Sequence, residues 1–90
     1  MTMTICSKQH RYDFKFNNLP DDQGGEGRHK CCGCAYDQGY RAGFSRTGQL
    51  WVDLCSLPES QAGTVRHKSP QAAFADGYRD GVRDSYRKAG

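Results

Sequence analysis

The sequence has 90 residues, of which 36% are hydrophobic and 26% charged, and its formal net charge is +3. That length fits one domain with a small core, and the mild basic excess is compatible with a nucleic-acid partner without requiring one. No run approaches the ~20 apolar residues that a membrane-spanning helix needs. The N-terminus has no apolar signal segment, and the five cysteines form an odd set, so we expect reduced thiols in the cytoplasm.

The first predicted element is a strand over residues 11–16. Tyr12, Phe14 and Phe16 alternate there with charged side chains, which is the period of a half-buried strand. Residues 19–27 follow with a proline, two aspartates and three glycines, a composition that predicts a flexible loop.

A cysteine cluster comes next, at the start of the first predicted helix. Cys31 and Cys34 have the C-x2-C spacing that places two thiolates around one tetrahedral zinc ion. The amide groups and dipole of the helix start would favour thiolate there. Cys6 and His10, spaced as C-x3-H, are the favoured second half of the site. We therefore predict zinc bound by four residues: Cys6, His10, Cys31 and Cys34. The ligands left open as alternatives are His29, His67 and Cys32.

An internal repeat is the most informative feature of the chain. Residues 28–43 recur as residues 66–81 at a constant offset of 38, with nine matched positions of which eight are identical. The shared pattern is R-H-K-x4-A-aromatic-x2-G-Y-R-x-G. The alanine and the two last glycines are four residues apart, so on a helix they form one smooth stripe. We predict helices over 34–44 and 72–87 that cross through these stripes about a pseudo-twofold axis, with the neighbouring aromatic side chains as the core.

The predicted elements between and after the repeats complete an α+β fold. Residues 50–54 alternate again and predict a second strand, residues 56–63 a single helical turn, and residues 64–66 a short extended piece. Ser69 and Pro70 are a good N-cap and first residue for the second helix. Aspartates and arginines alternate along that helix, which predicts an exposed, salt-bridged face. The whole is expected to be a single domain, residues 1–90, stapled by zinc.

The two repeat helices resemble the ribosome modulation factor family of bacteria. Ala35-x3-Gly39-Tyr40-x-Ala42-Gly43 is similar to the first helix of that family, and Phe74-x2-Gly77-Tyr78-Arg79-x-Gly81 to a later one. The resemblance implies a pair of packed helices and a small protein that docks on the ribosome to idle translation. The shared positions would be Tyr40, Arg41, Tyr78 and Arg79.

Three functions are compatible with these features. The favoured one is a small cytosolic zinc-binding regulator, of bacterial or phage type, that acts by binding a partner protein or a second copy of itself. The alternatives are a ribosome- or RNA-binding translation modulator, whose doubled basic patch would contact phosphates, and a thiol redox protein. Catalytic motifs such as a phosphate-binding loop or a nucleophile elbow are absent from the sequence, so we do not expect an enzyme. The candidate partner-binding residues are Arg28, His29, Lys30, Tyr40, Arg41, Arg66, His67, Lys68, Tyr78 and Arg79.

Overall fold

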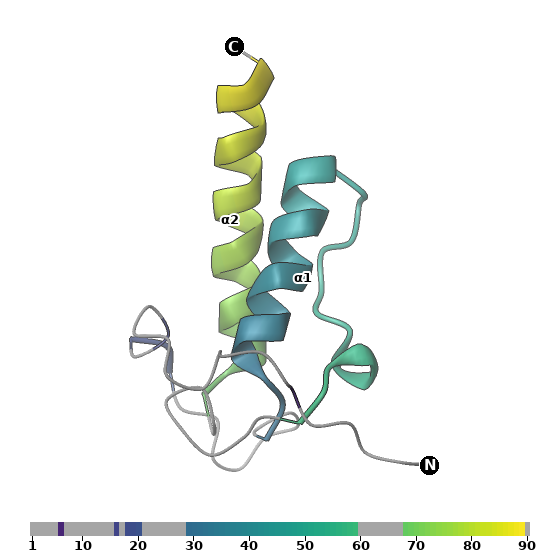
Figure 1. Cartoon of the computed structure of the whole chain (residues 1–90), viewed down its shortest axis with the longest axis vertical. Helices are drawn as coiled ribbons and strands as arrows, with labels where there is room; N and C mark the ends of the chain where they lie inside the picture. The colour runs from purple at the N-terminus through teal and green to yellow at the C-terminus, as the bar shows by residue number, and fades with distance from the viewer. Residues whose placement is uncertain (1–5, 7–15, 17, 21–28, 60–67, 90) are drawn as a thin grey trace.

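The computed structural model describes residues 6, 16, 18–20, 29–59 and 68–89. It contains helix α1 (Cys32–Ser45), a short 3-10 helix η3 (Leu54–Ser56) and helix α2 (Pro70–Ala89). The two α-helices lie side by side and run in the same direction, each beginning at the base of the molecule (Figure 1). The chain that leaves α1 descends along that helix toward η3 (Figure 1). Neither of these described helices is long and apolar enough to cross a membrane.

Both ends of α1 are defined by the backbone. The helix begins after Cys31, whose carbonyl accepts the first helical hydrogen bond from the Ala35 amide at 3.1 Å. It ends at Arg46, which adopts the left-handed conformation at φ 52° and donates its amide to the Ala42 carbonyl. A left-handed side chain other than glycine costs about 1 kcal/mol. The return of the chain toward the base begins at this residue.

The predicted start of α2 is confirmed. The Ser69 hydroxyl accepts a hydrogen bond from the Ala72 amide at 3.2 Å, and Pro70 is the first helical residue. The Ser69 amide in turn donates to the Pro20 carbonyl at 2.8 Å, so the base of α2 is tied to the N-terminal part of the chain.

The predicted crossing through small residues is also confirmed, and its contacts are reciprocal. A β-carbon on Gly39 would lie 2.8 Å from the Phe74 carbonyl carbon, and one on Gly77 would lie 2.9 Å from that of Tyr36. The repeat offset of 38 residues relates Gly39 to Gly77 and Tyr36 to Phe74, so these two contacts are equivalent. Gly43 against Tyr78 and Gly81 against Tyr40 form a second such set one turn further along. The helix backbones therefore touch, and the pair has an approximate twofold axis along its length.

The core lies at the base of the helix pair rather than along the aromatic rows. Its buried members are Cys6, Phe16, Leu19, Cys31, Cys32, Ala35, Leu57 and Ala73. Of the aromatic residues beside the stripes only Phe74 is buried, whereas Tyr36, Tyr40, Phe44 and Tyr78 are half-buried. The Phe16 ring packs edge-on against Tyr36 with centroids 5.8 Å apart.

The α+β prediction is wrong for the described part of the chain. Residues 50–53 are irregular and lead into η3. The described residues contain isolated β-bridge positions, such as the pair Lys30 and Glu59, but no strand. Alternation over residues 50–54 arose because Val52 and Leu54 pack against the core while Trp51 and Asp53 face solvent. Of the first predicted strand only Phe16 is described, and it lies in a 3-10 turn. The structure does not describe the other residues of that strand, most of the predicted 19–27 loop, or residues 60–66.

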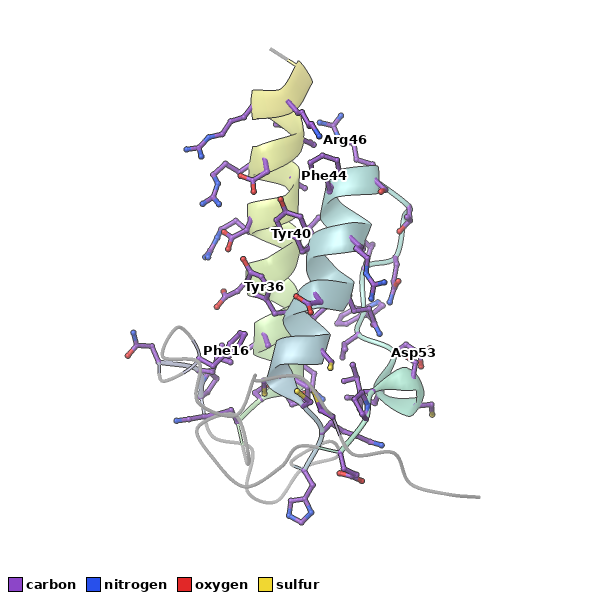
Figure 2. The ribbon with its side chains drawn as sticks, viewed as in Figure 1. Phe16, Tyr36, Tyr40, Phe44, Arg46 and Asp53 are labelled. Carbon is purple, nitrogen blue, oxygen red and sulfur yellow. The ribbon has the colours of Figure 1, made fainter. Side chains whose placement is uncertain are left out.

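A ladder of tyrosine and aspartate side chains joins α1 to α2 along one edge. The Tyr36 hydroxyl donates to Asp80 at 2.5 Å and the Tyr40 hydroxyl to Asp84 at 2.6 Å. The rings of Tyr36, Tyr40 and Phe44 follow one another along this edge (Figure 2). The predicted salt bridges of α2 are confirmed, since Arg79, Arg83 and Arg87 each pair with an aspartate of the same helix.

The ladder makes stability depend on pH at both extremes. The hydrogen bond from Tyr36 lowers the pKa of Asp80, so this contribution is present above the unfolded value of about 3.9 and is lost as the pH falls through the lower folded pKa. Burial and then the bond to Asp80 raise the pKa of Tyr36. Its contribution is complete below the unfolded value of about 10 and is lost as the pH rises through the folded pKa.

We predict that Tyr36→Phe lowers the free energy of unfolding by about 1 kcal/mol, near the low end for a hydrogen bond to a charged group because the pair is partly exposed. Urea titrations at several pH values would measure this, and the loss should vanish in acid, where Asp80 is protonated. Tyr78→Phe is the control, because it removes a hydroxyl outside the ladder. Equal losses in the two variants would contradict the role of the ladder.

Candidate metal centre

Three cysteine side chains converge where α1 begins. Cys31 is the N-cap of α1, and Cys34 lies in its first turn. Cys6 is held near them by the segment that follows η3. The Cys6 amide donates to the Glu59 carbonyl at 2.7 Å, and the Cys31 amide donates to the Pro58 carbonyl at 3.0 Å. The sulfur atoms of Cys6, Cys31 and Cys34 all lie within 4.8 Å of one another. They are therefore close enough to bind one metal ion.

The surroundings of Cys34 oppose ionisation of its thiol. The hydrogen bond with Cys31, burial, and the neighbouring charges of Cys31 and Cys6 all raise the pKa of the Cys34 thiol. Burial is severe for two members, since Cys31 is 1% exposed and Cys6 is 6% exposed. Thiolates packed this closely need a positive charge between them, and a divalent metal supplies it.

The structure brings together three of the four predicted zinc ligands. The fourth, His10, lies outside the described residues, as does the alternative His67. His29 is described and half-buried, but it is not a member of the cluster, and neither is the fully buried Cys32. C-x2-C spacing at a helix start was thus a sufficient signal for Cys31 and Cys34, and Cys6 was identified by its local pairing with a histidine.

Comparison with protein-family models, curated proteins and solved structures finds no match to this chain. The resemblance of the two helices to the ribosome modulation factor family is not tested by these comparisons and stays a prediction.

Lys30 and Glu59 support the cysteine cluster from outside. The Lys30 ammonium group donates to the Leu57 carbonyl at 3.3 Å and lies 3.8 Å from one Glu59 carboxylate oxygen. The other oxygen of Glu59 is buried and has no hydrogen-bond partner. Lys30 was predicted to contact a partner, but its described contacts hold residues 57–59 against the start of α1. The sequence carried no signal for Glu59.

The other candidate partner-binding residues do not form one described patch. Tyr40 belongs to the Tyr–Asp ladder, exposed Arg41 donates to the Asp37 carbonyl of its own helix, and Arg79 pairs with two aspartates. Lys68 is half-buried beside the start of α2. Arg28, Arg66 and His67 lie outside the described residues. The arginines of α2 are therefore paired with carboxylates of the same helix, which does not favour their binding to phosphates.

An apolar groove runs along the other edge of the helix pair. Phe74 and Tyr78 lie there, at the positions that the repeat equates with Tyr36 and Tyr40 of the ladder. It encloses about 370 Å³ and is lined by Leu50, Trp51, Val52, Leu54, Gln71, Phe74, Ala75 and Tyr78. Trp51 is 82% exposed and Leu50 66% exposed. A tryptophan this exposed at the rim of an apolar groove is unusual for a monomer surface. Sequence analysis placed Tyr78 at a partner surface but missed the rest of the groove.

Proposed function

We propose that this chain is a small zinc-binding module that regulates a partner protein by binding it. Zinc would be held by Cys6, Cys31 and Cys34, with His10 as the fourth ligand. The observation that carries this proposal is the convergence of three thiols from two distant parts of the sequence within 4.8 Å. The apolar groove beside Trp51 supports the second half of the proposal.

Zinc is the metal that this donor set fits best. Sulfur lies about 2.3 Å from zinc, so two thiolates of a tetrahedral site are roughly 3.8 Å apart. The sulfur atoms of Cys6 and Cys34 are 3.6 Å apart. Soft thiolate ligands exclude magnesium and calcium, which prefer oxygen.

The metal would act as a structural staple. The described core contains only eight buried members, several of them cysteine or alanine, and domains with so small a core commonly need a metal or a disulfide. Zinc would fasten Cys6 to the start of α1 and so keep the base of the helix pair closed.

The groove is suited to an uncharged, apolar segment of another protein. None of its eight lining residues carries a charge, and one wall is the exposed aromatic surface of Trp51. Burying a large apolar side chain there would remove both surfaces from water, and tryptophan is among the residues that most often dominate binding energy.

The zinc site is tested by native mass spectrometry of protein expressed with zinc. We expect one zinc ion per chain, lost in Cys6→Ser, Cys31→Ser and Cys34→Ser. Cys55→Ser is the matched control, since Cys55 is exposed and lies outside the cluster. His10→Ala should weaken binding, and His29→Ala should not. Absence of zinc, or its retention in all three cluster variants, would refute the site.

The docking surface is tested by Trp51→Ala. We expect at least ~30-fold weaker capture of the partner, corresponding to a hot-spot loss of about 2 kcal/mol. Quantitative cross-linking and affinity capture from a native extract would measure it, with Asp53→Ala as control because Asp53 is an exposed neighbour that does not line the groove. Equal capture by both variants would refute the assignment. A dimer that forms in the unchanged chain and is lost in Trp51→Ala would assign the groove to a second copy instead.

A further inference from the structure

We propose that Cys6 and Cys34 form a disulfide site, which a hydroperoxide converts from the zinc-bound dithiolate to the cystine with release of the metal. This inference rests on the proposed zinc site and adds a chemical modification to it.

The sulfur pair is already arranged for bond formation. The two sulfur atoms are 3.6 Å apart, although their residues are 28 positions apart in sequence. The Cys6 backbone is held by its hydrogen bond to Glu59, and Cys34 is fixed in the first turn of α1. A disulfide needs the sulfur atoms about 2.05 Å apart, so the two sulfur atoms must approach each other by roughly 1.5 Å.

Burial decides which sulfur meets the oxidant first. Cys6 and Cys31 are buried, whereas Cys34 is half-buried. Cys34 is therefore the accessible nucleophile of the cluster, and Cys6, whose sulfur atom lies 3.6 Å away, is assigned as the resolving thiol.

The reaction balances with hydrogen peroxide as the oxidant. The Cys34 thiolate attacks one peroxide oxygen, forming an S–O bond and breaking the O–O bond, and the departing hydroxide is protonated to water. The Cys6 thiolate then attacks the Cys34 sulfur, forming the S–S bond and expelling hydroxide, which becomes a second water. The two thiolates lose two electrons, peroxide gains them, and two protons are consumed. Zinc leaves as the divalent ion because it has lost two of its anionic ligands.

The disulfide would preserve the connection that zinc makes. Cys6 stays joined to the start of α1 in both states, while Cys31 loses its metal and takes up one further proton from solvent to become a thiol. Oxidation would therefore change the charge and reactivity of the base without detaching the N-terminal part from the helix pair.

The test uses the full chain loaded with zinc and treated with hydrogen peroxide. A chromogenic zinc chelator follows the released metal, and peptide mapping without reductant identifies the bridge. We expect one zinc released per chain and a Cys6–Cys34 bridge, both reversed by a dithiol reductant when zinc is present. Cys55→Ser should behave like the unchanged chain.

Two outcomes would overturn the inference. One is release of zinc with a Cys31–Cys34 bridge, and the other is retention of zinc while only exposed Cys55 is oxidised. If the reduced chain binds no zinc, the proposed function fails, and mapping of the same oxidised sample still decides the cysteine pairing.

Discussion

Gly77→Ala should destabilise the protein by about 2–3 kcal/mol, which is the cost of overpacking a tight contact. The new β-carbon would lie 2.9 Å from both the Tyr36 carbonyl carbon and the Tyr40 amide nitrogen. These are backbone atoms of α1, so no side chain can move aside and the helices must separate. Urea unfolding followed by circular dichroism measures the loss.

The sign of this change separates packing from helix propensity. Alanine is about 1 kcal/mol more favourable than glycine inside a helix, so propensity alone predicts a more stable variant. Gly39→Ala should repeat the loss, because its contact with Phe74 is the reciprocal one. Gly48→Ala is the control, since its β-carbon would meet nothing within 4 Å and its φ of +88° adds only about 1 kcal/mol of backbone strain. Stabilisation by Gly77→Ala would contradict the backbone contact.

Removal of zinc should lower the free energy of unfolding by about 4 kcal/mol, compared with protein at free zinc a thousand times its Kd. The reason is that the ion would bind the folded arrangement of Cys6, Cys31 and Cys34, which the unfolded chain does not preserve. Thermal unfolding with and without a chelator, at fixed protein concentration, measures the difference.

The cysteine variants provide the internal comparison for zinc removal. Cys31→Ser should unfold at one temperature whether or not zinc is present, and Cys55→Ser should keep the full zinc dependence. An unchanged chain whose unfolding midpoint ignores zinc would rule out a structural metal, even if an ion were found bound.

Local patterns predicted the helices well because the decisive signals lie within each helix. The stripe that contains Gly39 and Gly43 needs a close neighbour, and its copy in the second half of the chain supplies one. The Ser69 cap is likewise a contact over three residues. Two cysteines of the cluster, Cys31 and Cys34, could be predicted from their spacing at a helix start.

Features formed between distant segments could not be predicted in this way. Alternation over 50–54 is identical in a strand and in an irregular segment that packs every second side chain, so periodicity alone gave the wrong element. The exposure of Trp51 depends on where the chain turns back at Arg46, and the sequence carries no local sign of that. The partner of Tyr36 was missed because Asp80 had already been assigned to arginines of its own helix.

The approximate symmetry of the backbone does not extend to the side chains at the two edges of the helix pair, so the two edges differ in chemistry. In the repeat, Phe74 corresponds to Tyr36 and Ala42 corresponds to Asp80. One edge is therefore linked by a hydrogen bond between polar side chains, whereas the other edge is apolar. Helix α1 stops at Ser45, while α2 continues past the equivalent position 83 to Ala89. Only α1 is therefore followed, within the described residues, by a returning segment that completes a groove. Under the proposed function, a scaffold with two similar halves would thus receive a partner at the apolar edge, with a stoichiometry of one partner per chain.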